Sequence, residues 1–145
     1  FEHQYTYNGQ LSVAGCYYVT AIDSAQYNNE SSPSDTICFD NCPEFVLPNV
    51  FTPNNDGNND AFQALMPIRY INAIDMHIFN RWGLEVFNTT NPSFSWDGIN
   101  LESGLPSPSG VYYYNCTIEA LRLQGIVKND MNGFLHLFKD YENQH

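Results

Sequence analysis

Basic residues are scarce in this 145-residue chain, where five Lys and Arg stand against sixteen Asp and Glu, giving a net charge of −11 at pH 7. All five basic residues lie at Arg69 or beyond, so the first part of the chain carries acidic charge alone. Nucleic acid and anionic lipid have the same sign of charge and are repelled by such a surface. The sequence therefore predicts no nucleic-acid partner and leaves cations or a basic protein surface as partners.

Long hydrophobic runs are absent as well. No apolar stretch approaches the ~20 residues that a membrane-spanning helix needs. The first residues also lack the basic-then-apolar order of a signal peptide. We therefore expect a soluble piece from the end of a longer protein, with any export signal upstream of Phe1.

The short motifs of hydrolases and metalloenzymes are missing. The sequence has no GxSxG, the serines of residues 106–109 have no local histidine, and the four histidines show neither HxH nor HExxH spacing. These histidines are His3, His77, His136 and His145. We therefore predict that the chain is not an enzyme and has no small-molecule substrate.

Helical periodicity is also lacking, whereas β-branched and aromatic residues cluster in short runs. Alternation of apolar and polar residues is clearest in residues 71–79 and 111–123, which indicates a sheet with one packed face. The sequence predicts an all-β chain, an immunoglobulin-like antiparallel β-sandwich. Its expected strands are residues 46–51, 71–79, 84–87, 93–96, 111–123 and 133–138.

A hairpin of residues 11–22 and 35–39 precedes this sandwich and is similar to the last two strands of a fibronectin-type or immunoglobulin-like module. Two strands alone are marginal in water. We therefore expect residues 1–44 to be the end of an incomplete upstream module plus a linker, and residues 45–145 to be a separate domain.

Four cysteines without a CxxC pair favour two disulfides in an oxidising compartment over a zinc site. Three pairings are open. Cys16 and Cys38 lie symmetrically about the turn-rich residues 23–33, so a hairpin would set them opposite each other. We expect that pair, which leaves Cys42 with Cys116 and would staple the linker of residues 40–44 to the second domain.

A polar loop follows the expected strand at residues 46–51. Pro48 and Pro53 cannot donate to a β-ladder, so this strand should be short or at an edge, and Gly57 can supply a positive φ. The oxygen-bearing side chains alternate around this glycine, at Asn54, Asp56, Asn58 and Asp60. They fit either a weak calcium site or plain turns in which Asn and Asp bond their own backbone; the plain turn is favoured, and calcium is the single cofactor considered.

Two tryptophans, Trp82 and Trp96, could stack on sugars or pack in a core. Packing is the favoured interpretation because large aromatic side chains contribute heavily to cores, with Arg81 lying over one ring.

Four motifs in order carry a resemblance to a known family: LPNVFTPNNDGNNDAF at residues 47–62, FNRWGLEVF at 79–87, WDG at 96–98 and GVYYYNC at 110–116. From about residue 42 to 138 the chain resembles the type B C-terminal sorting domain of type IX secretion cargo, also described as the gliding-motility-associated C-terminal domain of Bacteroidota. The polar end DYENQH departs from the family pattern, which would stop near Phe138.

The resemblance implies a non-catalytic C-terminal signal that directs a large cargo protein through the periplasm and outer membrane to the cell surface or medium. Its implied partners are the type IX translocon and an outer-membrane protein of the PorP/SprF-like class. The alternative is an adhesive or carbohydrate-binding module of a cell-surface protein that uses Trp82 or Trp96. The residues expected to contact a partner are Thr52, Asn54, Asp56, Arg81, Trp82, Trp96, Phe134 and Phe138.

Overall fold

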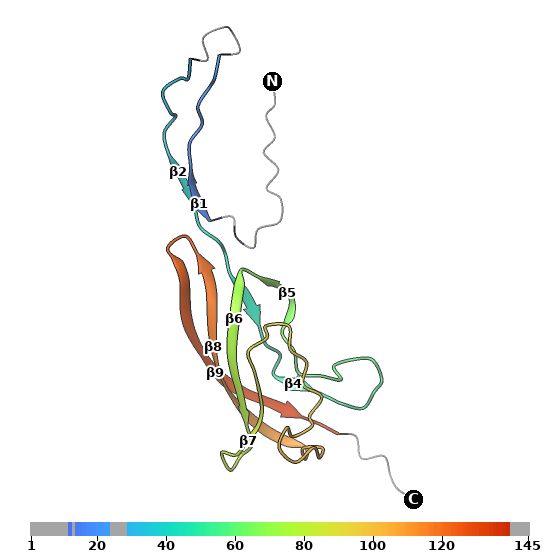
Figure 1. Cartoon of the computed structure of the whole chain (residues 1–145). Coiled ribbons are helices and arrows are strands. Elements are labelled where there is room, and N and C mark those ends of the chain that lie inside the picture. The colour runs from blue at the N-terminus through green and yellow to red at the C-terminus, as the bar shows by residue number, and fades with distance from the viewer. Residues whose placement is uncertain (1–11, 13, 24–28, 140–145) are drawn as a thin grey trace, which may run out of the picture.

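The computed structural model describes residues 12, 14–23 and 29–139, and these contain strands but no helix. His3, His145 and the polar tail after Lys139 lie outside the described residues. The described residues therefore include no helix long and apolar enough to cross a membrane. The strands run in the order β1 (Gly15–Tyr17), β2 (Ile37–Phe39), β3 (Glu44–Val46), β4 (Val50–Phe51), β5 (Leu65–Arg69), β6 (Ile71–Phe79), β7 (Glu85–Thr89), β8 (Gly110–Arg122) and β9 (Gly125–Leu137) (Figure 1).

A five-stranded sheet with the order β4-β9-β8-β6-β7 forms the larger layer. Its central strands β8 and β9, of 13 residues each, pair antiparallel from Gly110 opposite Leu137 to Arg122 opposite Gly125. The short β4 pairs with the far end of β9 and runs parallel to it. This sheet and the second layer form the all-β sandwich that the alternating pattern predicts.

The period-two pattern of β6 and β8 sends one set of side chains into the sandwich and the other to solvent. On β6, Ile74, Met76 and Ile78 are buried, and Asp75 and His77 lie on the outer face. On β8 the inner set includes Tyr112 and Cys116. Both assignments confirm the faces predicted for these strands.

The second layer is small. It consists of the antiparallel pair β3–β5 and of two loop segments joined where Phe62 and Trp96 exchange backbone hydrogen bonds of 2.8 and 3.0 Å. The strand predicted for residues 93–96 is reduced to this one bridge, because Pro92 and the turn around it precede it. The side chains buried between the layers are Phe45, Phe51, Phe62, Ala64, Ile74, Met76, Ile78, Val86, Phe94, Trp96, Tyr112, Cys116, Ile118, Leu135 and Leu137.

The prediction of a short edge strand next to the prolines is confirmed. β4 has two residues and stands at the edge of the larger sheet. Pro48 would lie opposite Phe134 if β4 continued, but it has no N–H to donate. The chain before Pro48 instead belongs to the other layer, where Val46 of β3 pairs with Leu65 of β5.

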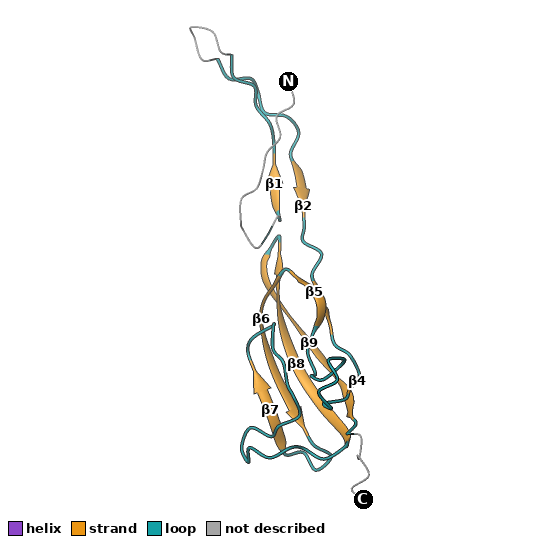
Figure 2. Cartoon of the chain, turned by 90° about the vertical axis from the view of Figure 1, so that its right-hand side faces the viewer, coloured by secondary structure: helices purple, strands orange, loops and turns teal. Residues whose placement is uncertain are grey.

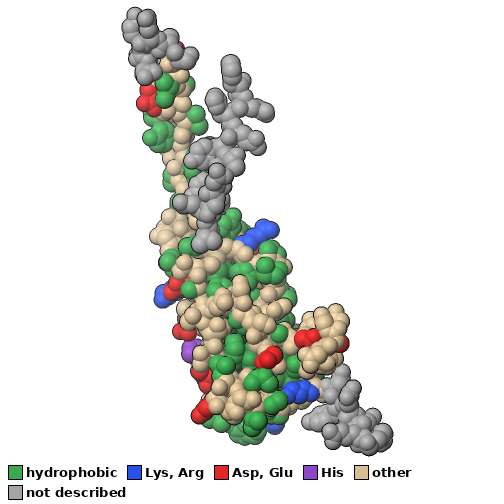
Figure 3. All heavy atoms as spheres, turned by 45° about the vertical axis from the view of Figure 1, so that its right-hand side comes forward, with side chains coloured by type: hydrophobic (Ala, Val, Ile, Leu, Met, Phe, Trp, Pro, Cys, Tyr) green, Lys and Arg blue, Asp and Glu red, His purple; other side chains and the backbone are tan. Residues whose placement is uncertain are grey.

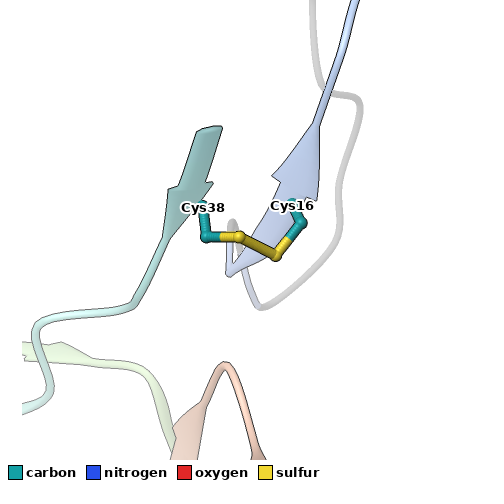
Figure 4. Close-up of a disulfide and its surroundings, with 2 residues drawn as sticks. All are labelled: Cys16 and Cys38. Atoms are coloured by element: carbon teal, nitrogen blue, oxygen red, sulfur yellow. A yellow bond between two sulfur atoms is a disulfide. The ribbon is translucent and has the colours of Figure 1, made fainter. Parts of the chain in front are cut away.

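The N-terminal hairpin is closed by the predicted disulfide between Cys16 and Cys38, which lie opposite each other on β1 and β2 (Figure 4). The strands are shorter than predicted because serine hydroxyls, in place of backbone carbonyls, accept the hydrogen bonds of the N–H groups that would continue the ladder. The backbone N–H of Val19 donates to Ser34 Oγ at 3.0 Å and that of Ala21 to Ser31 Oγ at 2.8 Å. The apolar side chains of this hairpin are largely exposed, and its origin in an incomplete module stays a prediction.

The predicted bond between Cys42 and Cys116 is wrong, because both cysteines are free. Cys42 is exposed in the linker, whereas Cys116 points into the core. The neighbouring Asn41 is bonded to Leu121, five residues further along β8 than Cys116. Five residues of strand span about 16 Å, whereas a disulfide requires Cα atoms within about 7 Å.

Polar contacts join the linker to the turn between β8 and β9 instead. The Asn41 side-chain amide donates to the carbonyl of Leu121 at 2.8 Å and to Ser12 Oγ at 2.8 Å. Asp40 accepts the N–H of Leu123 at 2.7 Å and pairs with Arg122 at 2.9 Å. The Leu123 amide is the main group that lowers the pKa of the Asp40 carboxyl. The hairpin therefore meets the sandwich at the end formed by this turn (Figure 2).

Candidate functional site

The loop of residues 52–60, which we call the side loop, extends sideways from the sandwich beside β4 (Figure 1), and Asp60 organises it. The Asp60 carboxylate accepts three backbone N–H groups, from Asn54 at 3.1 Å, Asn55 at 2.6 Å and Gly57 at 2.8 Å. Thr52 closes the loop by donating its N–H to the carbonyl of Asn59 at 2.8 Å. One half-buried carboxylate thus fixes the backbone of residues 54–57.

The other polar side chains of this loop make local turns. Asp56 accepts the N–H of Asn58 at 2.7 Å and the side-chain amide of Asn54 at 3.1 Å, and the first of these bonds is the main cause of the lowered pKa of Asp56. Asn55, Gly57 and Asn59 have φ angles of 60, 86 and 53°, values that Gly and Asn tolerate. The predicted positive φ at Gly57 is confirmed.

The same side chains are the ones considered for calcium. The carboxylates of Asp56 and Asp60 are turned toward backbone N–H groups, whereas a calcium ion requires six to eight oxygens directed at one point. Among the described residues, no three His, Cys, Asp or Glu side chains are grouped to hold a metal. The hydrogen bonds account for the shape of the loop, and calcium binding by Asn54, Asp56, Asn58 and Asp60 stays a prediction.

Arg81 and Trp82 lie at the turn between β6 and β7. Asn80 shapes this turn by accepting the N–H groups of Trp82 and Leu84, each at 3.0 Å. The Arg81 guanidinium lies 4.7 Å from the centre of the Trp82 ring, which is the cation–π contact expected for one of the two tryptophans. Trp82 is 71% exposed, so core packing is the wrong interpretation for this ring, and it is available to a partner.

Trp82 belongs to an exposed apolar cluster at the end of the sandwich furthest from the hairpin. We define this distal tip as Trp82, Leu84, Leu101 and Leu105, all well exposed. Leu101 is held beside β7 because its N–H donates to the carbonyl of Val86 at 2.9 Å. Trp82 and Leu105 line a pocket of about 150 Å³. Sequence reasoning missed the three leucines because they are scattered over two loops.

Trp96 is buried, so its place among the predicted contact residues is wrong. It is 1% exposed and packs against Phe51, Phe87 and Tyr112 with ring centres 5.4, 5.8 and 5.6 Å away. Its indole N–H donates to the carbonyl of Ile99 at 2.8 Å, which satisfies the one polar group of the ring. Trp96 is therefore a core residue, in agreement with the favoured packing interpretation.

Phe134 and Phe138 lie on the outer face of the larger sheet, where they flank His136. The His136 ring stacks on Phe138 with a 7° angle between planes and meets Phe134 edge-on. Neighbouring strands extend the group, because β8 places Val111 and Tyr113 opposite His136 and Phe134, and β4 places Val50 opposite His136. We define this outer strip as Val50, Val111, Tyr113, Phe134, His136 and Phe138. All except His136 are large hydrophobic residues that are exposed.

The predicted contact residues other than Trp96 fall into three groups. Thr52, Asn54 and Asp56 are in the side loop, Arg81 and Trp82 at the distal tip, and Phe134 and Phe138 in the outer strip. Figure 3 shows one face of the molecule, where hydrophobic side chains reach the surface among acidic ones and few basic ones. The distal tip and the outer strip are at the same end of the sandwich, opposite the hairpin (Figures 1 and 2).

On the outer face of the larger sheet, His77 lies between two carboxylates. It lies 2.7 Å from Glu85 and 3.1 Å from Asp75, and it stacks beside Phe79. The hydrogen bond that His77 donates to Glu85 is the main cause of its raised pKa. The pKa of Glu85 is lowered, first by Asn88 and then by His77. The contacts of His77 are therefore those of a cross-strand ion pair.

Residues 45–137 match a protein family described as CHU_C Type IX secretion signal domain. No curated protein and no solved structure matches the chain. The matched range begins within β3 and ends with the last residue of β9, so it covers the sandwich and leaves the N-terminal hairpin outside.

Proposed function

The chain belongs to the type IX secretion signal domain family, and we propose that its sandwich performs this sorting function as a rigid, non-catalytic label. As a member of the family, it is a signal that engages the type IX secretion machinery and leads to export to the cell surface or medium by way of the outer membrane. The observation that carries the proposal is the coincidence of the family match with strands β3 to β9.

Rigidity supports recognition of a folded surface. The central hairpin is paired along its whole length, and the side loop is fixed by the three N–H groups that Asp60 accepts. A partner that binds such a surface has little ordering entropy to overcome, in contrast to one that must order a flexible peptide.

We place the recognition surface at the end of the sandwich that carries the distal tip and the outer strip. The chain before β3 enters at the opposite end, where Asn41 contacts Leu121, so the described part of the hairpin lies away from these surfaces (Figure 2). Exposed apolar clusters of this kind are typical of protein-binding sites. Trp82 and Phe134 are the best candidates for central contacts, since exposed aromatic residues often dominate interfaces.

For the partner we propose an outer-membrane protein of the PorP/SprF-like class, which the family resemblance implies. The net charge of −11 favours a neutral or basic surface on that partner and disfavours nucleic acid. We also propose that the chain has no catalytic activity. The family match supports this, because a secretion signal domain acts by being recognised.

The test is a fusion of the whole 145-residue chain to the C-terminus of a passive periplasmic reporter protein in a bacterium with a type IX system. We expect the reporter at the cell surface or in the medium, and in the periplasm of a matched strain without the translocon. Retention of the folded fusion in the periplasm of the first strain would contradict the sorting function. A double substitution, Trp82→Ser with Phe134→Ser, should reduce export, and the matched Val19→Ser on the hairpin should not.

A further inference from the structure

Strand β9 has one side that pairs with β8 and another that is nearly bare. Among the described residues, β4 alone pairs with that second side, at His136 and Leu137. Residues 126–134 have no strand beside them on this side, although they belong to a long, regular strand with an unbroken register to β8. The larger sheet therefore ends in an edge nine residues long.

The direction of the backbone groups along this edge follows from the bonds at its end. The N–H of His136 donates to Asn49 at 2.8 Å and that of Phe138 to Phe51 at 3.1 Å, both away from β8. Because alternate residues of a strand direct their N–H and C=O to opposite sides, the even-numbered residues face the bare edge. No backbone hydrogen bond within the described part of the chain reaches the five residues concerned, Ile126, Lys128, Asp130, Asn132 and Phe134.

Two charged side chains that could shield this edge are held on the sheet. Lys128 pairs with Glu119 at 3.0 Å, and Asp130 accepts the Thr117 hydroxyl at 2.8 Å. Both partners belong to β8, on the side away from the edge. Charged side chains usually protect an edge by projecting over it. Lys128 and Asp130 instead point toward β8, so they do not protect this edge.

A hollow of about 410 Å³ lies on the inner side of the same edge. It exists because the small second layer does not cover the end of the sheet near the β8–β9 turn. The residues that line it are Pro43, Ala120, Arg122, Gln124, Val127 and Asn129. Val127 and Asn129 are the inward-facing residues between the edge positions, so a strand added to the edge would direct alternate side chains into the hollow.

We propose that the edge of β9 from Ile126 to Phe134 binds an extended, non-acidic segment of the export machinery, which adds to the sheet as a further strand. The inference rests on the proposed sorting function and names the kind of partner segment. A row of donors and acceptors at strand spacing is matched by another extended chain. The charge of −11 disfavours an acidic segment, and it disfavours a second copy of this chain because two such charges would meet.

The test blocks the edge without touching the core. Asn132 is exposed and its N–H faces the edge, so Asn132→Pro removes a donor that β8 does not use. The matched control is Asn132→Ala, which keeps the N–H. In the fusion described above, we expect Asn132→Pro to lower the exported fraction at least tenfold and Asn132→Ala to be exported like the parent chain. Lys128→Pro, with Lys128→Ala as control, provides a second pair.

Amide hydrogen exchange of the purified chain shows whether each variant is folded. In the parent, we expect slow exchange at Val127, Asn129 and Met131 and fast exchange at Lys128 and Asn132. Equal protection of both sets in a monomer would mean that the chain already covers its own edge, and would overturn the inference. A dimer in sedimentation that disappears in Asn132→Pro would identify a second copy as the occupant and would also overturn it.

The export results separate the two claims. If the parent fusion is exported and folded Asn132→Pro and Lys128→Pro are exported equally well, the edge inference fails and the sorting function stands. If the parent fusion itself stays in the periplasm, the sorting function fails. Loss of export in both folded proline variants, with both alanine controls unaffected, supports the edge as the binding site.

Discussion

The side-chain amide of Asn41 donates a hydrogen bond of 2.8 Å to the backbone carbonyl of Leu121, joining the linker to the last residues of β8. Asn41 is 3% exposed, so its side-chain amide is shielded from water, and Leu121 is half-buried. Such a bond is costly to remove, because the carbonyl of Leu121 then loses its donor in a partly buried position.

Asn41→Ala should therefore lower the free energy of unfolding by about 1–2 kcal/mol, the usual cost of a buried unsatisfied group. Urea unfolding followed by circular dichroism measures the change. The control is Asn129→Ala, an exposed asparagine on β9, which should change it by less than about 0.5 kcal/mol. Equal effects of the two substitutions would show that Asn41 does not anchor the linker.

The two tryptophans should differ sharply in their contribution to stability. Trp96→Ala removes a ring that contacts three aromatic neighbours and should cost about 3–5 kcal/mol, as for other large core residues. Trp82→Ala removes an exposed ring and should cost less than about 0.5 kcal/mol. Urea unfolding of the two variants gives both values, and similar losses would contradict the burial of Trp96.

Asp60→Asn should loosen the side loop, because an amide oxygen is a weaker acceptor than a carboxylate and the NH₂ group cannot accept the N–H of Gly57. We expect amide exchange at Asn54, Asn55 and Gly57 to become at least several-fold faster, while β8 and β9 keep their protection. The expected loss of stability is about 1–2 kcal/mol. Protection of these amides in the parent chain that required added calcium would instead indicate a bound ion.

The ion pair of His77 makes a pH-dependent contribution to stability. Because its folded-state pKa is raised, the protonated form is stabilised: the contribution is complete below the unfolded pKa near 6.5 and is lost as pH rises through the folded pKa. Glu85 has a lowered pKa, so its share is lost as pH falls through that lower value. The stability difference between the parent and His77→Gln should therefore be largest near pH 5.5–6, at about 0.5 kcal/mol as for other exposed pairs. NMR titration of His77 that gave a pKa below 6.5 would contradict this.

The cysteines should react in three separate steps. Cys42 is exposed and should be alkylated by a maleimide in the native protein, whereas burial raises the pKa of Cys116 to about 11 and keeps it unreactive until the chain unfolds. Cys16 and Cys38 should react only after reduction. Mass spectrometry should find one adduct in the native chain, two after denaturation and four after reduction. Protection of Cys42 in the native chain would contradict its exposure.

The strands with strict alternation were predictable, and the layer arrangement depended on contacts that alternation does not encode. Residues 71–79 and 111–123 were assigned with the correct faces, because a period of two distinguishes the inner side chains from the outer ones. β5 and the first half of β9 were missed. Pro67 interrupts the first, and Gly125, Lys128 and Asp130 make the second read as a turn, although pairing with β8 keeps it extended.

The surface was only partly predictable for a related reason. Arg81 and Trp82 were found because a motif singled them out, and their exposure agrees with a contact role. Leu84, Leu101 and Leu105 come together only through the turn and loop bonds of the fold, which no local pattern reveals. The staple from Cys42 to Cys116 failed because cysteine counting ignores distance along a strand, whereas Asn41 performs the attachment through hydrogen bonds.

The position of β8 and β9 has a consequence for biosynthesis. These strands are the last of the sandwich to be translated, yet they join the other strands of the larger sheet: β4 has no partner in that sheet until Leu137 has been made, and the hairpin of β6 and β7 has no link to β4 before then. A ribosome that stops before Gly110 releases a chain without the strands that unite the sheet. Such a chain would lack the folded recognition surface. Export would therefore require synthesis of the sandwich through Leu137.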